Sequence, residues 1–285
     1  MKPAPFVRHV PKTIDEALRL LNEVASDDGR ILAGGQSLVP MMAFRMARPA
    51  HLVDINEVAG LDRLAVESGK LVVGARVRHA AFHKAAVLGP LGALLSTVAG
   101  NIAHYPIRMR GTMCGSLANA DPASEWCLTA ATLDAEMVAK STDGTRVIPA
   151  REFFAGIMST ALAENELLAE ILLPLLPDGA RFGFNEFSRR AGDFAMSASL
   201  VVYELKDDKI AAPRVGVGGA ESHPRRIAEA EALLVGRHPN GDTFKVAADA
   251  AAAAIDPLED SQTTAEYRRD LVRAVVRRAL EASAK

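Results

Sequence analysis

The stretch that decides the fold is Arg30-Ile31-Leu32-Ala33-Gly34-Gly35-Gln36-Ser37-Leu38, in which a short apolar run leads into a glycine turn. A second turn of small residues comes much later, as Gly111-Thr112-Met113-Cys114-Gly115-Ser116. We call residues 33–38 the first cradle and residues 111–116 the second cradle. Glycine lets backbone N–H groups approach an anion closely and tolerates positive φ angles, and neighbouring Ser and Thr add hydroxyl donors. The two turns together predict two backbone cradles for one extended anionic ligand.

The first cradle, taken alone, leaves two interpretations open. It is not the G-x-G-x-x-G fingerprint of a dinucleotide-binding unit, and it lacks the lysine of a P-loop. A double-glycine turn between a strand and a helix is often only a connection. A helix start beside a hydroxyl also suits an anion, and Ser37 is predicted to cap a short helix over residues 38–45. The candidate contacts are Ala33, Gly34, Gly35, Gln36, Ser37 and Leu38.

The second cradle is followed by polar residues that extend the candidate site. The candidates in and after it are Gly111, Thr112, Gly115, Ser116, Asn119, Asp121 and Glu125. The last three have spacings that could reach ribose hydroxyls or order the loop. Asp121 stands directly before Pro122, a favoured pairing at a helix start, which predicts a helix over residues 122–133 with Asp121 as its N-cap. Arg108, just before the cradle, is either a counter-charge to phosphate or a surface residue.

Composition excludes several classes of protein. The chain has 285 residues, 49% of them apolar, and a net charge of −2, which points to neither nucleic acid nor an anionic membrane as a partner. Residues 85–107 carry no Asp, Glu, Lys or Arg, but glycines, prolines and polar side chains interrupt the run too often for a membrane-spanning helix. The N-terminus lacks the apolar run of a signal peptide.

The two cysteines, Cys114 and Cys127, are too few for a disulfide framework, which makes the cytoplasm the expected location. They are also too few for an iron–sulfur cluster held by four thiolates of one chain. His79 and His83 have the spacing of a zincin helix but lack its glutamate, so no metal site is expected. We expect Cys114 to be an inert packing residue, because no basic residue adjoins it in the sequence.

Periodicity and turn signals predict an α+β protein. Thr13 and Glu16 form a predicted capping box at the start of a helix over residues 13–25. The expected strands cover residues 30–33, 51–55, 70–75, 135–140, 145–148, 167–173, 181–188, 197–205 and 209–217, and the expected helices also include 79–85, 90–99, 226–235, 242–254 and 264–283. The best boundary is Pro174-Leu175-Leu176-Pro177-Asp178-Gly179. We therefore expect domains at 1–176, with subdomains of about 1–56 and 57–176, and at 177–285.

Three ordered blocks of the sequence resemble one family, the FAD-binding medium subunits of molybdenum hydroxylases, which include the carbon monoxide dehydrogenase and xanthine dehydrogenase flavoproteins. Residues 33–60 resemble its A-G-G-x-S-L region through to an L-V-D-I strand, and residues 107–134 its I-R-x-x-G-T-x-G-G region. Residues 187–195, which we call the third block, resemble a segment ending G-D-[YF]-A, and residues 265–269 a C-terminal block. The resemblance covers nearly the whole chain.

The resemblance implies a function in electron transfer. It implies a fold of the vanillyl-alcohol-oxidase type, in which two subdomains clamp FAD, followed by a domain with a three-stranded antiparallel sheet and helices. The two cradles would bind the FAD pyrophosphate and adjoining groups, Asn119, Asp121 and Glu125 would line the nucleotide side, and Phe194 would lie at the flavin ring. From the residues alone, Phe194 is as readily a core residue. The partners would be a large subunit with molybdenum cofactor and a small subunit with two 2Fe–2S clusters, in a dimer of heterotrimers that delivers electrons to an external acceptor.

Two alternatives stay open, and departures from the family pattern motivate one of them. Cys114 replaces the first glycine of a pair, Pro106 replaces a polar residue, and Trp126-Cys127 replaces Leu-Pro. If the missing glycine needs a positive φ angle, the cysteine would weaken FAD binding. One alternative is therefore a scaffold subunit that has lost FAD, and the other is a self-sufficient flavin reductase or oxidase.

Overall fold

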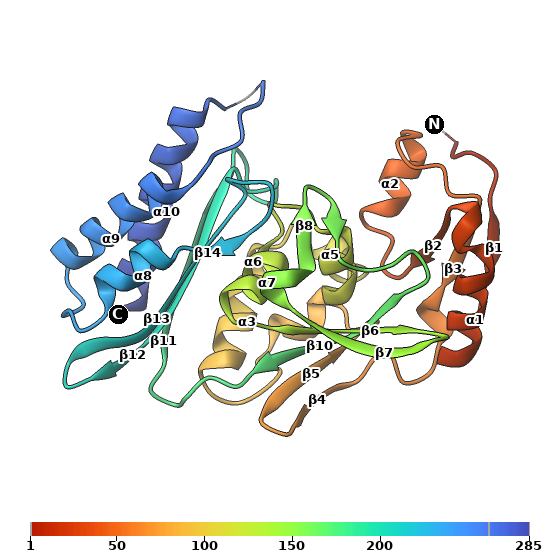
Figure 1. The fold of residues 1–285 in the computed structure, drawn as a ribbon, viewed down its shortest axis with the longest axis horizontal. Helices are drawn as coiled ribbons and strands as arrows, with labels where there is room; N and C mark the ends of the chain where they lie inside the picture. Colours follow the sequence, from red (N-terminus) through yellow and green to blue (C-terminus); the bar gives the residue numbers. More distant parts are fainter. Residues whose placement is uncertain (1, 262, 285) are drawn as a thin grey trace.

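The computed structural model describes residues 2–261 and 263–284 and arranges them around three main sheets (Figure 1). The strand orders are β1-β3-β2, β4-β5-β10-β6-β7 and β11-β12-β13-β14, and β8 and β9 form a separate two-stranded hairpin. In Figure 1 these sheets follow one another across the molecule, from the N-terminal part in red and orange to the C-terminal part in blue.

The N-terminal sheet is parallel and carries the first cradle at one of its strand ends. It consists of β1 (Val7–His9), β2 (Gly29–Leu32) and β3 (His51–Asp54), and α1 (Ile14–Val24) packs against β2 and β3. The side chain of Thr13 caps α1 by accepting from the Glu16 amide, as predicted, but Glu16 accepts in return from the Lys12 amide rather than from Thr13. The expected helix and strands are confirmed, whereas β1 was not predicted.

The central sheet is antiparallel. Its strands are β4 (Leu64–Glu67), β5 (Lys70–Gly74), β6 (Glu136–Ser141), β7 (Gly144–Pro149) and β10 (Leu167–Pro174). The predicted hairpin with Asp143 in its turn is confirmed as β6–β7, and β4 was not predicted. The hairpin β8 (Phe154–Gly156) and β9 (Ser159–Thr160) follows α7 (Ala150–Phe153).

The other helices of the N-terminal and central parts are mostly short. They are the 3-10 helices η1 (Ala25–Asp27), η2 (Ile55–Glu57) and η3 (His79–His83), and the α-helices α2 (Leu38–Ala43), α3 (Pro90–Asn101), α4 (Tyr105–Arg108), α5 (Met113–Asn119) and α6 (Glu125–Thr132). None of the helices in the described part of the chain is long and apolar enough to cross a membrane.

The C-terminal sheet contains the three long antiparallel strands that the sequence predicts, plus one short strand. These are β11 (Arg181–Phe187), β12 (Ser197–Lys206) and β13 (Lys209–Gly218), with β14 (Arg225–Arg226) at the edge. The helices α8 (Ala228–Leu234), α9 (Gly241–Ala254) and α10 (Ala265–Ser283) lie on its outer face (Figure 1). The inner face meets α3 and α6 of the central part.

Strand β12 separates two hydrophobic cores. Ala198, Leu200 and Val202 belong to the core shared with the N-terminal and central sheets. Val201 and Tyr203 belong to the second core, under α8–α10. Successive side chains of a strand point to opposite faces, so one strand serves both cores. This packing brings the third block, which immediately precedes β12, to the side of the molecule that carries the loop after the second cradle.

Two expectations about helix starts are wrong. The helix expected over residues 122–133 begins only at Glu125, and Ser124 is its cap. Asp121 instead accepts from the Ala123 amide in a separate turn, and the Pro122 carbonyl accepts from the Gly219 amide of the C-terminal part. Ser37 stands before α2 but makes no capping hydrogen bond with its side chain, and α2 ends at Ala43 rather than residue 45.

Candidate functional site

The two cradles lie directly against each other, although they are far apart in the sequence. A Cβ atom added to Gly34 would stand 2.4 Å from the carbonyl oxygen of Arg110 and 2.6 Å from the Cα of Gly111. A Cβ on Gly115 would be 4.0 Å from the Cβ of Ala33. Gly35 has a φ of +70°, a conformation that favours glycine. The glycines are therefore needed both for the turns and for the close contact between them.

The second cradle is held by side chains that face the core. Thr112 is buried, and its hydroxyl oxygen accepts from the Gly115 amide at 3.1 Å as the N-cap of α5. A Cβ on Gly111 would stand 2.5 Å from Nε2 of His79, whose backbone amide donates to the Gly111 carbonyl. The indole N–H of Trp126 donates to Nδ1 of His79 at 2.9 Å. Burial, followed by the charges of Arg78 and Arg108, lowers the pKa of His79 to about 4, so a neutral imidazole supports the loop.

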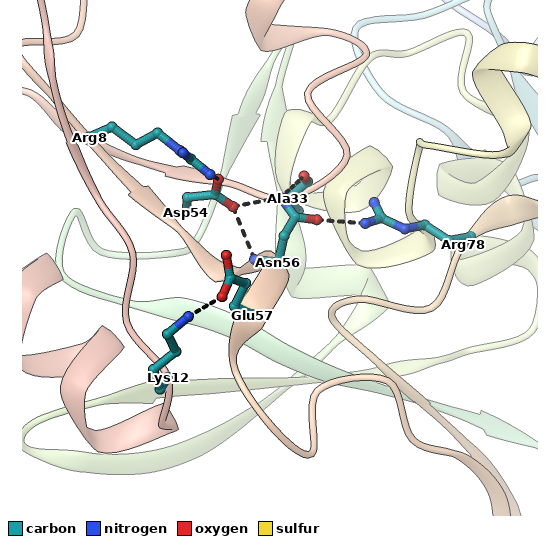
Figure 2. Close-up of polar contacts among 7 residues, drawn as sticks. All are labelled: Arg8, Lys12, Ala33, Asp54, Asn56, Glu57 and Arg78. Atoms are coloured by element: carbon teal, nitrogen blue, oxygen red, sulfur yellow. Dashed lines mark hydrogen bonds and ion pairs between the residues drawn. The ribbon is translucent and has the colours of Figure 1, made fainter.

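The first cradle is held mainly from one end, by Asn56 at the centre of Figure 2. Its Nδ2 donates to the Ala33 carbonyl at 2.8 Å and to Oδ1 of Asp54 at 2.6 Å. Its Oδ1 accepts from Nη2 of Arg78 at 2.5 Å. The other guanidinium nitrogen of Arg78, Nη1, donates to the Arg110 carbonyl, immediately before the second cradle.

Asp54 anchors this network in the N-terminal sheet. It is 3% exposed, and its Oδ2 accepts from Nε and Nη2 of Arg8 on β1, at 2.9 Å and 2.5 Å. Burial alone would raise the pKa of Asp54, but hydrogen bonds from Asn56 and Arg8 outweigh it and hold the pKa below its ordinary value. The carboxylate is therefore ionised and tightly held at neutral pH.

The residues after the second cradle differ in their surroundings. Nδ2 of Asn119, at the end of α5, lies 3.7 Å from the sulfur of Met158. Asp121 is partly exposed at the turn described above. Glu125 is buried, and that burial, followed by the negative charge of Asp121, raises the pKa of Glu125 to about 7. The loop thus combines one solvated carboxylate with one that takes up a proton near neutral pH.

The third block contacts the loop that precedes the second cradle. Gly192 has a φ of +86° and packs on the ring of His104. A Cβ added to Gly192 would stand 2.4 Å from Cε1 of that ring. Beside this contact is a cavity of about 240 Å³ lined by Glu186, His104 and Arg108 among others. Oε2 of Glu186 is buried there without a hydrogen-bond partner, and burial, then the charge of Glu125, raises the pKa of Glu186 to about 8.

Two open questions from the sequence receive an answer. Phe194 is 66% exposed, so it is not a core residue. Arg108 donates from Nη1 to the carbonyl oxygens of Ile102 and Ala103, at 2.6 Å and 2.9 Å, and is only partly buried. It therefore holds the loop before the second cradle, while its Nε is buried without a partner near the cavity.

Cys114 does not strain the second cradle. It is the second residue of α5, with helical backbone, is 3% exposed, and donates weakly to the Val73 carbonyl. Burial and the charge of Glu170 raise the pKa of Cys114, and burial raises the pKa of Cys127 to about 12. Both thiols are inert packing groups, and the concern that Cys114 needs a positive φ angle is wrong.

Sequence reasoning missed the residues that support the cradles. Asn56, Arg78, His79, Trp126 and Glu186 were not candidates for binding the ligand. Asn56 does lie within the first resembling block, immediately after its L-V-D-I strand, and this position is the one signal that could have found it. The supported arrangement is a pair of backbone loops that can bind an extended anionic ligand, with a nearby cavity lined by the carboxyl group of Glu186.

Comparison with known protein families covers almost the whole chain. Residues 4–176 match the family described as "FAD binding domain in molybdopterin dehydrogenase". Residues 182–283 match the family described as "CO dehydrogenase flavoprotein C-terminal domain".

Individual relatives match along their full length. The chain is 38% identical to the 6-hydroxypseudooxynicotine dehydrogenase complex subunit alpha of Paenarthrobacter nicotinovorans, over 98% of this chain and 95% of that protein. It is 35% identical to the nicotine 6-hydroxylase medium subunit of the same organism, over 97% and 96%. A solved structure of carbon monoxide dehydrogenase from Hydrogenophaga pseudoflava superimposes with a TM-score of 0.95 at 34% identity, covering 100% of this chain and 99% of that one.

Proposed function

We propose, on the premise that this chain belongs to the family of FAD-binding medium subunits of molybdenum hydroxylases, that it is the electron-transferring flavoprotein component of such a complex. FAD is the cofactor of this family, and the chain is an oxidoreductase component. When bound, FAD supplies the two-electron redox chemistry, and the protein supplies position and electrostatics.

The observation that carries the proposal is the backbone contact between the two cradles. Gly34 against Arg110 and Gly111 leaves no room for a Cβ, and Gly115 stands next to Ala33. One diphosphate can therefore receive hydrogen bonds from both turns, as the nucleotide of FAD requires. The residues that would hold FAD are Ala33, Gly34, Gly35, Gln36, Ser37, Leu38, Gly111, Thr112, Gly115, Ser116, Asn119, Asp121, Glu125 and Phe194.

The redox end of the ligand would lie toward the third block. The exposed ring of Phe194 is available to cover a flavin ring, and the neighbouring cavity adds His104 and the carboxylate of Glu186. Glu125 and Glu186, whose pKa values are raised by burial to about 7 and about 8, can hold protons near this end at neutral pH.

We further propose the organisation of the chain and its complex. The FAD-binding domain spans residues 1–176, with subdomains of about 1–56 and 57–176, and the C-terminal domain spans 177–285. A small subunit with two 2Fe–2S clusters relays electrons from a large subunit with molybdenum cofactor, in a dimer of heterotrimers in the cytoplasm. Bound FAD would supply the redox chemistry for delivery of these electrons to an acceptor such as NAD⁺, a quinone or oxygen. The reason for a scaffold without FAD was strain at Cys114, and that strain is absent.

Two measurements test this proposal. The purified chain is expected to show flavin absorption bands and to release its FAD on acid precipitation, because binding is non-covalent. Expressed alone, it is expected to give no substrate-dependent dye reduction, and expressed with the neighbouring reading frames it is expected to co-elute with a larger and a smaller subunit. A colourless chain that takes up no added FAD would contradict FAD binding. Full substrate-dependent dye reduction by the lone chain would instead support a self-sufficient flavoenzyme.

A further inference from the structure

Asn56 and Arg78 join the two cradles by a continuous run of hydrogen bonds. Asn56 donates from Nδ2 to the Ala33 carbonyl at 2.8 Å, and Arg78 donates from Nη2 to Oδ1 of Asn56 at 2.5 Å. Arg78 also donates from Nη1 to the Arg110 carbonyl. Ala33 opens the first cradle and Arg110 directly precedes the second. We call this link the Asn56–Arg78 bridge, and Figure 2 shows its part from Ala33 through Asn56 to Arg78.

Both ends of the bridge are fixed by their surroundings. Oδ1 of Asp54 accepts from the Nδ2 of Asn56 at 2.6 Å and from its backbone amide at 3.0 Å, which sets the direction of the side chain. Asp54 is itself held by Arg8. At the other end, the backbone of Arg78 pairs with that of Thr112 in an isolated antiparallel bridge. The bridge therefore has a fixed length and cannot swing away from the cradles.

The donors and acceptors of the two side chains suit residues that hold two loops at a fixed separation rather than residues that only fill space. An asparagine amide offers a donor and an acceptor at the same depth, and both are used here. Aspartate would keep the acceptor for Arg78 but lose the donor to Ala33, and leucine would lose both. Arginine presents a planar fork that reaches two acceptors on different segments, which a lysine ammonium on its flexible stem does not reproduce.

A ligand that touches two loops at once needs those loops at one separation. If the first cradle could move relative to the second, binding would have to order it, and that cost would weaken affinity. The carbonyl oxygen of Arg110 is the atom that both accepts from Arg78 and approaches Gly34. The bridge and the glycine contact thus act on the same spacing.

We propose that Asn56 and Arg78 are positioning residues that set the separation of the two cradles and thereby the affinity for the diphosphate of FAD. This inference rests on the proposed function, because it takes FAD as the ligand of the cradles.

The test measures the FAD dissociation constant of the deflavinated full-length chain by fluorescence titration. Asn56→Leu is expected to raise it about tenfold or more, because three partly buried side-chain hydrogen bonds are lost, two of them with the charged groups of Asp54 and Arg78. Asn56→Asp is also expected to raise it, because a carboxylate oxygen would replace the Nδ2 that now donates to Oδ1 of Asp54 at 2.6 Å. Arg78→Lys is expected to give a smaller increase, since the lysine keeps the positive charge but not the planar fork. The matched control is Glu57→Gln. Glu57 lies in the same short helix as Asn56, and the substitution breaks its exposed ion pair with Lys12. This control is expected to leave the dissociation constant unchanged.

A second set of measurements separates positioning from a merely structural role. ADP carries the diphosphate without the flavin ring, so its affinity, measured by competition with FAD, is expected to fall by the same factor as that of FAD. The visible absorption and circular dichroism of the flavin at saturation are expected to stay those of the parent protein, because the hydrogen bonds of the bridge go to Ala33, Asp54 and Arg110 and to none of the residues of the third block. An altered flavin spectrum, together with a loss of unfolding free energy that accounts for the weaker binding, would overturn the proposal.

The outcomes also separate this inference from the proposed function. If the parent chain binds no FAD, the proposed function fails and the bridge has no ligand to position. If the parent chain binds FAD and all three bridge variants bind it equally well, the bridge proposal alone fails.

Discussion

The first cradle lies at the surface, where Gln36 is exposed and Ser37 makes no capping hydrogen bond, whereas the second cradle is built into the core. In the second cradle, Gly111 and Thr112 are buried, Thr112 caps α5, and His79 and Trp126 support the loop from behind. The two turns have similar composition, but only one of them is part of the packed interior. A substitution in the second cradle therefore acts on folding and binding together, and one in the first acts mainly on binding.

The difference extends to the carboxylates behind each cradle. Asp54, behind the first, is hydrogen-bonded by Asn56 and Arg8, and its pKa is held below the ordinary value despite burial. Glu125, beyond the second, is buried near Asp121, and its pKa is raised to about 7. The stability contribution of Asp54 is therefore lost on acidification, and that of Glu125 is lost as the pH rises.

Adding one methyl group to each cradle is expected to give the largest effect. In Gly34→Ala, the Cβ would meet the Arg110 carbonyl oxygen at 2.4 Å, and because both groups are backbone, the two cradles must move apart. Such overpacking costs about 3 kcal/mol at the upper end, which corresponds to roughly a hundredfold rise in the FAD dissociation constant.

The comparison is sharpened by Gly111→Ala, in which the Cβ would meet the buried His79 ring. This variant is expected to lose unfolding free energy as well as FAD affinity, whereas Gly34→Ala is expected to lose mostly affinity. Gly241→Ala, with nothing within 4 Å of the new Cβ, is the control for both. Chemical denaturation and FAD titration give the two quantities, and equal losses of stability in the two cradle variants would contradict the distinction.

Besides Glu186 and His79, one contributor to the pH dependence of the apoprotein should be Glu125. Its pKa is 4.5 in the unfolded chain and about 7 in the folded one, so its stability contribution is complete below 4.5 and is lost as the pH rises to 7. For a nearly fully buried group this loss is on the order of 3 kcal/mol. Glu125→Gln is expected to flatten that decline, measured by urea unfolding at a series of pH values.

The first-cradle carboxylate should respond in the opposite sense. The folded pKa of Asp54 lies below its unfolded value of 3.8, so its contribution is present above that pH and is lost on further acidification. Asp54→Asn is expected to remove this acid-side loss and to leave the change between pH 4.5 and 7 in place. The proposed opposition fails if both variants alter the same arm of the profile.

Removing one hydroxyl group from each cradle, that of Thr112 or that of Ser37, is expected to have a smaller effect on stability and FAD affinity. Thr112→Val removes the cap of α5, which costs about 1 kcal/mol of stability. A lost hydrogen bond to phosphate would add roughly a tenfold rise in the FAD dissociation constant. Ser37→Ala is expected to leave stability unchanged, because Ser37 makes no capping bond. Thermal unfolding and FAD titration of both variants test this, and an unchanged dissociation constant for Thr112→Val would remove its hydroxyl from the site.

Cys114→Gly should have the smallest effect on binding. Restoring the glycine of the family pattern relieves no backbone strain, since Cys114 is helical and buried. The variant is expected to lose about 0.5–1 kcal/mol of stability through the helix penalty of glycine, with some further loss from the vacated thiol. FAD affinity is expected to stay the same, and neither thiol of the native parent should react with a thiol reagent. Tighter FAD binding would show that the cysteine does distort the loop.

Much of the fold is readable from the sequence because its signals are local. The capped α1, the β6–β7 hairpin and the three long C-terminal strands depend on patterns within a few residues, and they were predicted close to their observed bounds. The errors arose where tertiary contacts outweighed a local preference. Asp121-Pro122 has the composition of a helix start, but the Gly219 amide holds the Pro122 carbonyl in a separate turn. The short β1 and β14 give almost no periodic signal and are stabilised by pairing with β3 and β13.

The sequence by itself determined most of the longer elements, the two glycine turns and, through three ordered blocks, the family. Only the tertiary structure decided that Gly34 meets Arg110 and that Asn56 and Arg78 join the cradles. It also decided that Cys114 is helical and that Phe194 is exposed. The physical reason is the distance along the chain over which each interaction acts. Glycine conformation and helix capping act over a few bonds and leave a trace in the local sequence, whereas a hydrogen bond between distant segments depends on how whole sheets pack, which no single stretch of residues records.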